Sequence, residues 1–408
     1  MYMNIAITFG GKSVEHDVSI LTGLHASRNV MDGVGVYLVY LTRGNGMLTG
    51  SALSSIDYYI NGRGKAHECM FSNDVLYKRG GFGFKQVAKI DAVLNCCHGG
   101  IGENGELAGF FASLGVPVTS SDSFAASAMM SKSFTRELFS KKGKDKFDQP
   151  KYMAFKKSDI KDGIEELCKQ VTKKIGFPII VKPDTLGSSI GITVVHNEDE
   201  LVQGVELAFT LDNTIVVEEF LKNAVEINCA AFRSGNEIFV SVCEHLDKES
   251  QFLDFDKKYL QQGGFIKKIG KQREEEVDQG LNDIFKEIQK MTKRAYEKFG
   301  ASGVVRFDYL VTGYNSKRAE TKLGQEQLGK KDVILSEAVG RDSIKIYLNE
   351  ANSVPGFLSY HLWHRGGIPY GLLVDMLVKQ AIQDYEAHDI VKSSFKSEIL
   401  TKNRGLVE

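Results

Sequence analysis

Strand-like and helix-like segments alternate along the first part of this chain. Residues 4–9 and 36–41 form two strand-like runs with a helical stretch between them. A third run, 91–97, precedes another helical stretch at 107–114. A strand–helix–strand order requires a crossover connection, which makes neighbouring strands parallel. The pattern therefore predicts an α/β fold with a parallel sheet, in which ligands bind beyond the carboxyl ends of the strands.

Two glycine-containing loops, Gly10–His16 and His98–Gly105, follow strands of this predicted sheet. Gly11–Ser13 resembles the end of a P-loop, but Ala6 stands where that motif has its first glycine, so a P-loop NTPase is disfavoured. The first strand is not followed by G-x-G-x-x-G, and a dinucleotide-binding fold is equally disfavoured. The Gly80–Gly83 stretch is interpreted as the tip of a hairpin.

The size and composition of the chain limit the classes to which it can belong. Its 408 residues exceed what one hydrophobic core usually supports, and we expect two or three domains. A net charge of -1 gives no general attraction to nucleic acid or anionic membrane, and no apolar run approaches the roughly 18 residues of a membrane span. The sequence opens without a signal-peptide pattern, and its six cysteines lack CxxC spacing. These features predict a cytoplasmic protein with reduced thiols.

Two later strands end in oxygen-bearing side chains. Arg306 and Asp308 share a face at the end of one apolar run, because side chains alternate along a strand. Glu350 and Asn352 follow another apolar run in the same way. Carboxylate and amide oxygens suit Mg²⁺, which usually shares a few protein ligands with substrate phosphates. The pattern fits a magnesium–phosphate site and a pair of β-hairpin strands that end in polar turn residues equally well.

Residues 177–195 combine a lysine-bearing strand, a Gly/Ser turn and a second strand, which predicts a β-hairpin. Lys182 lies in the first strand, and the turn contains Gly187, Ser188 and Ser189. Backbone N–H groups, hydroxyls and a nearby ammonium can hold a polyphosphate. An exposed hairpin with a solvated lysine is the alternative. Further along, an amphipathic helix is expected from about residue 277 up to Gly300, because glycine commonly ends helices.

The order of these motifs resembles that of ATP-grasp enzymes. The Lys182 strand and its Gly-Ser-Ser turn are followed by V-E-E-F-L, R-F-D and N-E-A-N-S-V-P-G. The segments F-G-G-K-S-V-E-H-D-V-S, H-G-G-I-G-E-N-G and S-A-M-M-S-K make the chain similar to the D-alanine–D-alanine ligase family, from residue 4 to about 380. The resemblance implies an ATP-grasp fold behind an N-terminal parallel-sheet domain. The expected divisions are 1–120, 121–218 and 219–408.

The resemblance also implies that ATP and two Mg²⁺ ions, or Mn²⁺ in their place, bind between the second and third divisions. The residues implied are Lys132, Lys182 and, on a mobile loop, Lys258 for the phosphates; Glu218, Phe220 and Leu221 for the adenine side; Glu226 for the ribose hydroxyls; and Asp308, Glu350 and Asn352 for the metal ions.

The implied reaction joins two D-alanines. One carboxylate attacks the γ-phosphate of ATP to form an acyl phosphate, and the amine of the second substrate then attacks that carbonyl. The residues implied are Glu15, Ser188 and Tyr259 for a triad that binds the first ammonium group and closes the mobile loop; Arg306 and the backbone N–H of Gly356 for the oxyanion; and His98, His361 and Leu362 for further substrate contacts.

Three features depart from the family pattern. Residues 313–342 form a long polar insertion where the family has a short hairpin, and Asn104 stands where an acidic residue is common. His361 replaces a serine that contacts the carboxylate of the second substrate. It is expected either to donate to that carboxylate or simply to pack beside Trp363. Tyr259 favours an acceptor with an amine over a hydroxy acid.

The resulting hypothesis is synthesis of D-alanyl-D-alanine for peptidoglycan precursors by a cytoplasmic homodimer, without nucleic-acid or membrane partners. The alternative acceptor is D-serine. Two other classes remain open. One is a different ATP-grasp carboxylate–amine ligase, and the other is a nucleotide-binding protein without activity. The presence of the Mg²⁺-type residues and of Arg306 argues against the second.

Overall fold

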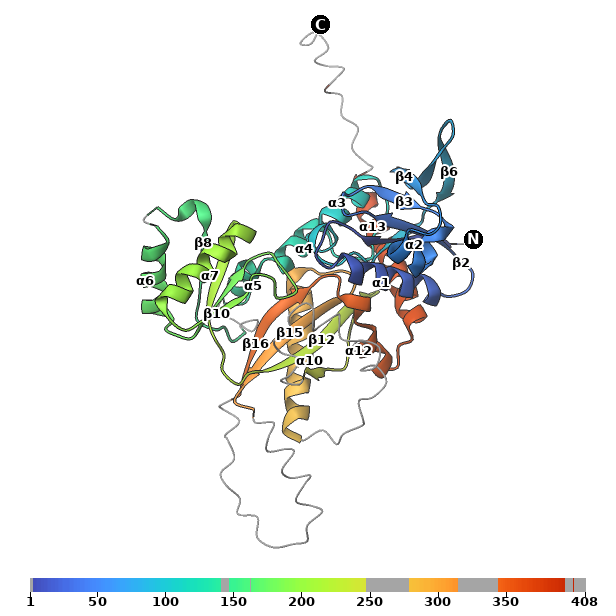
Figure 1. Cartoon of the computed structure of the whole chain (residues 1–408). Helices are drawn as coiled ribbons and strands as arrows, with labels where there is room; N and C mark the ends of the chain where they lie inside the picture. Colours follow the sequence, from blue (N-terminus) through green and yellow to red (C-terminus); the bar gives the residue numbers. More distant parts are fainter. Residues whose placement is uncertain are drawn as a thin grey trace.

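Three β-sheets, of seven, four and five strands, organise the molecule. The computed structural model describes residues 3–140, 147–161, 163–246, 279–314, 344–392 and Ile399. The N-terminal sheet lies at one side, the four-stranded sheet at the other, and the five-stranded sheet between them (Figure 1). Lys258, Tyr259 and all of the predicted insertion except Gly313 and Tyr314 lie outside the described residues.

The N-terminal sheet has a parallel part and an antiparallel extension. In spatial order its strands are β6 (Gly83–Lys89), β5 (Val75–Gly80), β4 (His67–Ser72), β3 (Met47–Thr49), β2 (Val34–Leu41), β1 (Met3–Gly10) and β7 (Ala92–Asn95). β1 runs parallel to β2 and β7, as predicted. β3 to β6 continue the sheet antiparallel. The strands predicted to be parallel are parallel, and the antiparallel extension makes the complete sheet mixed. The hairpin expected at Gly80–Gly83 is confirmed.

Side chains cap the first turn of some of the helices near this sheet. α1 (His16–Asn29) connects β1 to β2, short α2 (Ile56–Asn61) precedes β4, and α3 (Glu106–Ser113) follows β7. The Asp122 side chain accepts from the N–H of Ala125 to start α4 (Ser123–Met130). The hydroxyl of Ser131 accepts from the N–H of Phe134 at 3.1 Å and starts α5 (Lys132–Ser140).

The four-stranded sheet is antiparallel and carries the predicted hairpin. Its strands, in spatial order, are β10 (Thr193–Val195), β9 (Ile179–Pro183), β11 (Thr214–Glu219) and β8 (Tyr152–Lys156). Thr193 pairs with Val181, which confirms the hairpin. Apolar residues of α6 (Ile164–Lys174) and α7 (Glu198–Leu211) form one core with the sheet.

The five-stranded sheet presents one apolar face and one polar face. Its strands are β13 (Glu237–Val240), β12 (Val225–Ser234), β15 (Val305–Thr312) and β16 (Lys345–Asn352), with β14 (Glu244–Leu246) also paired to β12. α10 (Gln279–Phe299) packs its apolar side against Val305, Phe307 and Tyr309, which confirms the predicted amphipathic helix. Because side chains alternate, Arg306 and Asp308 face away from that core.

A β-bulge decides which side chains of β16 face the site. Asp308 pairs with Glu350, whereas the next residue, Tyr309, pairs with Leu348, so Asn349 is the extra residue. Leu348 is therefore buried in the core with α10, although simple alternation would put it on the same face as Glu350. The bulge turns Glu350 to the polar face while the apolar half of the strand keeps its packing.

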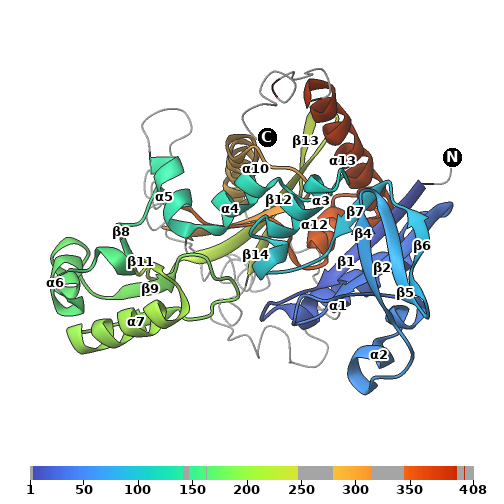
Figure 2. The same ribbon diagram turned by 90° about the horizontal axis from the view of Figure 1, so that it is seen from above.

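The C-terminal helices join the first and third sheets. They are α12 (Tyr360–Arg365) and α13 (Tyr370–Lys392), and the latter contacts both β7 and β12 (Figure 2). Ile7 of β1, Phe232 of β12 and Trp363 of α12 belong to one hydrophobic core. This shared core holds the loops that follow β1 and β7 beside the end of β16.

No helix in the described part of the chain is long and apolar enough to cross a membrane. All six cysteines lie within the described residues and are free thiols, five of them buried, as expected from their spacing.

Candidate active site

Loops from all three sheets converge at one place. The hydroxyl of Ser188, in the β9–β10 turn, donates to the carboxylate of Glu15, in the loop after β1. The loop after β7 contacts the end of β16, where the hydroxyl of Ser353 donates to the carbonyl of Glu103 at 3.0 Å. Glu15 and Ser188, which the sequence analysis placed in one triad, are thus brought together, while Tyr259 lies outside the described residues.

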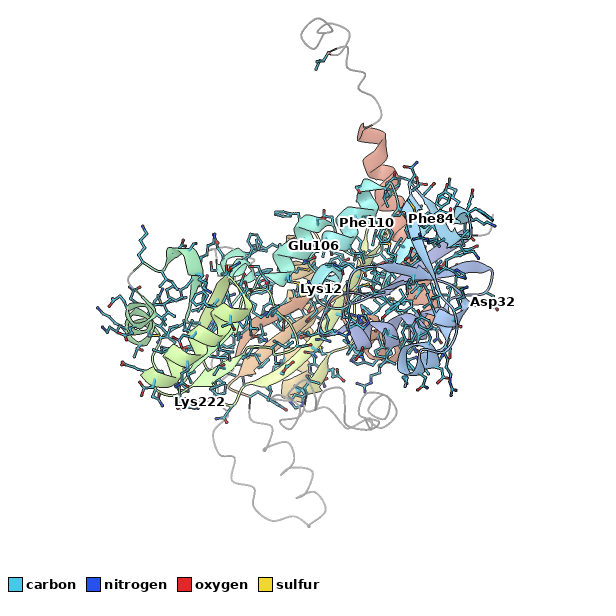
Figure 3. The ribbon with its side chains drawn as sticks, turned by 45° about the horizontal axis from the view of Figure 1, so that its top comes forward. Lys12, Asp32, Phe84, Glu106, Phe110 and Lys222 are labelled. Atoms are coloured by element: carbon cyan, nitrogen blue, oxygen red, sulfur yellow. The ribbon has the colours of Figure 1, made fainter. Side chains whose placement is uncertain are left out.

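The Glu15–Ser188 contact depends on unusual backbone. Ser188 and Ser189 both have left-handed φ angles, 53° and 59°, which are rare for residues with a β-carbon. A side chain at Gly99 would start 2.7 Å from the carboxylate of Glu15, so this position requires glycine. Lys12 of the discounted P-loop-like segment is exposed at the surface (Figure 3).

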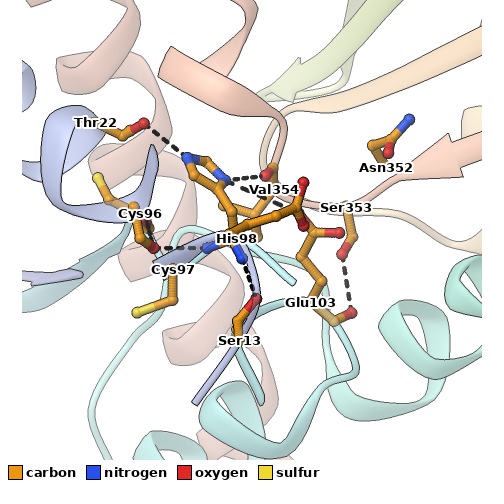
Figure 4. A network of polar contacts seen from close by, with 12 residues as sticks. Ser13, Thr22, Cys96, Cys97, His98, Glu103, Asn352, Ser353 and Val354 are labelled. Atoms are coloured by element: carbon orange, nitrogen blue, oxygen red, sulfur yellow. Dashed lines mark hydrogen bonds and ion pairs between the residues drawn. The ribbon is translucent and has the colours of Figure 1, made fainter. Parts of the chain in front are cut away.

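His98 is buried between the N-terminal sheet and the chain after β16 (Figure 4). Its Nδ1 lies 2.5 Å from the carbonyl oxygen of Val354, and its Nε2 lies 2.7 Å from the hydroxyl of Thr22. Because a carbonyl can only accept, Nδ1 carries the proton. Burial lowers the pKa of His98 to about 4, so the ring is neutral at physiological pH.

Glu103 is a site residue that the sequence analysis missed. Its carboxylate lies 3.9 Å from Nδ1 of His98. Burial, and then the nearby charge of Glu15, raise the pKa of Glu103 well above its ordinary value. Ionisation of both of two neighbouring carboxyl groups in a buried site is energetically unfavourable, because like charges repel. The signal available in the sequence was the single glutamate in the His98–Gly105 loop.

A buried ion cluster joins α5 to the four-stranded sheet. The Nε of Arg136 donates to one oxygen of Glu218 at 2.6 Å, and the ammonium of Lys182 donates to the other at 2.8 Å. Arg136 also donates to the carbonyl of Leu348 in β16. Burial alone would raise the pKa of Glu218, but the two cations lower it well below its ordinary value. Sequence reasoning had not singled out Arg136.

The two predicted phosphate lysines point into the same region. Lys182 also donates to the side-chain oxygen of Asn349 at 3.2 Å, and burial lowers the pKa of its ammonium. The ammonium of Lys132 donates to the carbonyl of Leu186 at 2.7 Å and lies 3.4 Å from Glu350. Lys132 and Arg136 are one turn apart on α5, so both face the sheets.

The predicted metal ligands form part of a polar row across the five-stranded sheet. Successive cross-strand partners are Glu244, Asn228, Asp308 and Glu350, from β14, β12, β15 and β16. Arg306 makes two hydrogen bonds to Asp308, at 2.7 and 2.8 Å. The amide of Asn352 donates to Asp308 at 3.0 Å.

These residues fit a hard cation by their chemistry. No group of three His, Cys, Asp or Glu side chains suited to a metal occurs among the described residues, but Mg²⁺ usually needs only one or two carboxylates besides substrate phosphates. Asp308 and Glu350 supply two, and Asn352 would present its amide oxygen in place of its N–H. Asn228 is buried, and its side-chain oxygen has no hydrogen-bond partner in the described structure. A cation or a bound donor beside Asp308 would satisfy that oxygen.

The residues predicted for the nucleotide base and ribose lie along the edge between the second and third sheets. Phe220 and Leu221 directly follow β11 and are half-buried, and the N–H of Phe220 donates to the carbonyl of Pro178 at 3.1 Å. Glu226 is half-buried in β12. Lys258 lies outside the described residues.

His361 has a partner that sequence reasoning did not identify. Its Nε2 lies 2.9 Å from a carboxylate oxygen of Glu244, so it does more than pack beside Trp363. Leu362 is fully buried in the core shared with the N-terminal sheet, and only its backbone is left to contact a substrate. Gly356 is the first residue of a short turn, Gly356–Ser359, that directly precedes α12.

The Glu244–His361 pair should stabilise the fold in a pH-dependent way. Burial would raise the pKa of Glu244, but the hydrogen bond and charge of His361 lower it below its ordinary value of 4.5. A carboxylate with a lowered folded pKa stabilises the fold above its unfolded value and loses that effect as pH falls through the folded value. We expect Glu244→Gln to lower the free energy of unfolding by about 1.5 kcal/mol at pH 7. Urea unfolding at several pH values should show this difference shrinking below pH 4.5, and a pH-independent difference would contradict the assignment.

Comparison with known proteins agrees with this geometry. A family model described as D-ala D-ala ligase N-terminus matches residues 4–121, and one described as D-ala D-ala ligase C-terminus matches residues 143–320. The chain belongs to the D-alanine–D-alanine ligase family. A D-alanine–D-alanine ligase from Staphylococcus epidermidis is 31% identical over 414 residues, covering 96% of this chain and 98% of the relative. One from Thermosipho melanesiensis is 29% identical over 398 residues, covering 95% and 96%.

Solved structures of the D-alanine–D-alanine ligase fold superpose along nearly the whole chain. The D-alanine–D-alanine ligase from Coxiella burnetii has a TM-score of 0.72 at 19% identity, covering 95% of this chain and 98% of its own. VanG D-Ala:D-Ser ligase from Enterococcus faecalis has a TM-score of 0.69 at 24% identity, covering 93% and 100%. The expected α/β ATP-grasp fold is therefore confirmed, and the protein is an ATP-grasp ligase of this family.

Proposed function

We propose that this ligase uses ATP to join D-alanine to a second D-alanine through a D-alanyl phosphate, for the synthesis of peptidoglycan precursors. The observation that carries the proposal is the contact between Ser188 and Glu15 across two domains. It holds a carboxylate at the carboxyl end of β1, within reach of the loop that carries His98. An anionic group held there suits the ammonium of a first D-alanine.

The first step transfers the γ-phosphoryl group of ATP to the carboxylate of that D-alanine. Catalysis of phosphoryl transfer consists mostly of positioning and charge neutralisation. Lys132 and Lys182 are buried and converge from α5 and β9, which suits them to hold the phosphate oxygens. Mg²⁺, held by Asp308, Glu350 and Asn352, would neutralise charge on the phosphates when bound.

In the second step the unprotonated amine of the second substrate attacks the carbonyl carbon of the acyl phosphate, and inorganic phosphate leaves as the amide bond forms. The carbonyl oxygen becomes an oxyanion, which Arg306 and the backbone N–H of Gly356 would stabilise. Loss of one such donor typically costs about 2.7–4 kcal/mol of transition-state stabilisation. Asp308 holds the guanidinium of Arg306 through two hydrogen bonds, so this donor is oriented before the reaction. No protein nucleophile is required.

We propose that Glu218, Phe220, Leu221 and Glu226 border the adenine and ribose of ATP. Lys258 and Tyr259, in the segment between β14 and α10, would contribute to the same site. Of the adenine-side residues, Glu218 is already paired with Arg136 and Lys182. Its proposed contribution is therefore to hold Lys182 in place beside the phosphates. We further propose a cytoplasmic homodimer.

The identity of the acceptor depends on His361, which the family resemblance assigns to the second substrate and which is paired with Glu244. D-serine is the second candidate, since its hydroxyl could hydrogen-bond to this pair, and VanG, which shares the fold, is described as a D-Ala:D-Ser ligase. A hydrophobic pocket discriminates poorly against an added hydroxyl, whereas a polar one can favour it.

The test measures ADP release with D-alanine alone and with D-alanine paired with D-serine or D-lactate, and mass spectrometry identifies each product. We expect ADP release with D-alanine alone, and no product that contains D-lactate. Turnover only with D-serine present would replace the acceptor but retain the ligase reaction. An absence of ADP release with every D-amino acid tested would contradict the proposed function.

A further inference from the structure

The hydroxyl of Thr22 links two parts of the site that are far apart in the sequence. Thr22 lies in α1 and is fully buried. Its Oγ1 lies 2.7 Å from Nε2 of His98 and 3.2 Å from the backbone N of Phe357. Figure 4 shows Thr22, His98 and Val354 in line, with the imidazole between the other two.

The direction of each hydrogen bond in this chain follows from chemistry. The N–H of Phe357 can only donate, so Thr22 accepts from it. Nδ1 of His98 donates to the carbonyl of Val354, which leaves Nε2 as an acceptor for the hydroxyl proton of Thr22. The hydrogen bonds thus run from Phe357 through Thr22 and His98 to Val354, so they begin and end in the same segment of the chain. Both ends of the stretch 354–357, which contains Gly356, are held by the N-terminal domain.

The turn held in this way has an unfavourable backbone. Phe357, Leu358 and Ser359 have successive φ angles of 50°, 53° and 53°, in the left-handed region that a β-carbon disfavours. Three such residues in a row persist only where surrounding contacts determine the conformation. The indole N–H of Trp363 donates to the carbonyl of Leu358 at 3.1 Å, which supports the far end of the turn. Thr22 supports its near end.

We propose that Thr22 is a positioning residue for the ligase reaction, whose hydroxyl holds the Gly356 turn and orients the imidazole of His98. This inference rests on the proposed function of Gly356 and His98. Thr22 touches neither the reacting atoms nor ATP in this assignment. Its loss should therefore slow turnover by misplacing the backbone donor, with little effect on ATP binding.

The test compares Thr22→Val, which keeps the shape but removes the hydroxyl, with Thr22→Ser, which keeps the hydroxyl. Thr49→Val is the matched control. The buried hydroxyl of Thr49 in β3 donates to the carbonyl of Leu38 in β2 at 2.8 Å, so its loss also removes a buried hydrogen bond of the N-terminal domain, but one away from the site. We expect Thr22→Val to lower kcat roughly 10–100-fold with an unchanged KM for ATP. Thr22→Ser and Thr49→Val should stay within about threefold of the parent protein. If Thr22→Val does not fold, Thr22→Ala replaces it.

Hydrogen exchange supplies a readout that does not depend on activity. In Thr22→Val, exchange should accelerate in peptides covering 354–359 and stay unchanged in peptides covering β1 and β2. Equal kcat in Thr22→Val and Thr49→Val would overturn the inference, as would a failure of Thr22→Ser to restore kcat. An inactive parent protein would contradict the proposed function, and the exchange comparison would then still decide whether Thr22 holds the turn.

Discussion

Replacement of Glu350 by glutamine should lower ADP release with D-alanine and ATP by roughly 10³-fold or more while the chain stays folded. Each tenfold loss in rate corresponds to about 1.4 kcal/mol, and charge neutralisation at a transferring phosphoryl group is worth several kcal/mol. Glutamine has the same size as glutamate but no charge. Glu350 of β16 pairs with Asp308 of β15, and its carboxylate lies 3.4 Å from Lys132.

The fold should tolerate this change because the side chain of Glu350 is 26% exposed and lies outside the hydrophobic core. Glu237→Gln, at the exposed first position of β13 in the same sheet, is the matched control and should keep full activity. The Mg²⁺ concentration required for half-maximal rate should rise in Glu350→Gln and stay constant in the control. Unchanged turnover would refute the assignment of Glu350 as a metal ligand.

Replacement of Arg136 by methionine should lower the free energy of unfolding by about 3 kcal/mol, because one buried oxygen of Glu218 loses its donor and only Lys182 is left to balance the carboxylate charge. The side chains of Arg136 and Glu218 are only 2% and 3% exposed. The substitution also removes the donor to the carbonyl of Leu348. Denaturant unfolding followed by tryptophan fluorescence and circular dichroism measures the loss.

Arg233→Met provides the control for that prediction. Arg233 makes two hydrogen bonds to Asp384, at 2.9 and 2.8 Å, but the two side chains are 31% and 30% exposed. A solvent-exposed ion pair contributes about 0.2–1 kcal/mol, so this variant should be much the more stable of the two. A loss below about 1 kcal/mol in Arg136→Met would show that water or Lys182 compensates Glu218, contrary to the burial argument.

The residues proposed to carry the chemistry could be identified from the sequence where they stand in ordered motifs. Lys182, Ser188, Asp308 and Glu350 each follow or lie within a strand whose pattern could be recognised. The structure brings Ser188 to Glu15 and sets Asp308 opposite Glu350. Local patterns predict such positions because a strand end determines where its last side chains emerge.

Partners of these residues could not be found in the same way. Arg136 lies in an ordinary amphipathic helix, and Thr22 looks like any small residue on the buried side of α1. Glu244 is one carboxylate among many. Each acquires its role only through a contact made across a long sequence separation, with Glu218, His98 and His361 respectively. A single sequence carries no signal for pairs of this kind.

The sequence by itself determined the parallel β2–β1–β7 arrangement, the β9–β10 hairpin, the α10 helix and the family to which the chain belongs, because these depend on short-range periodicity and on ordered motifs. Only the tertiary structure decided which groups meet. The bulge at Asn349 turns Glu350 to the polar face while Leu348 remains in the core. The core shared by β1, β12 and α12 sets His98 against Val354. Both outcomes depend on how separate elements pack. Burial of the apolar side chains fixes the register of the strands, and the register determines which polar side chains meet.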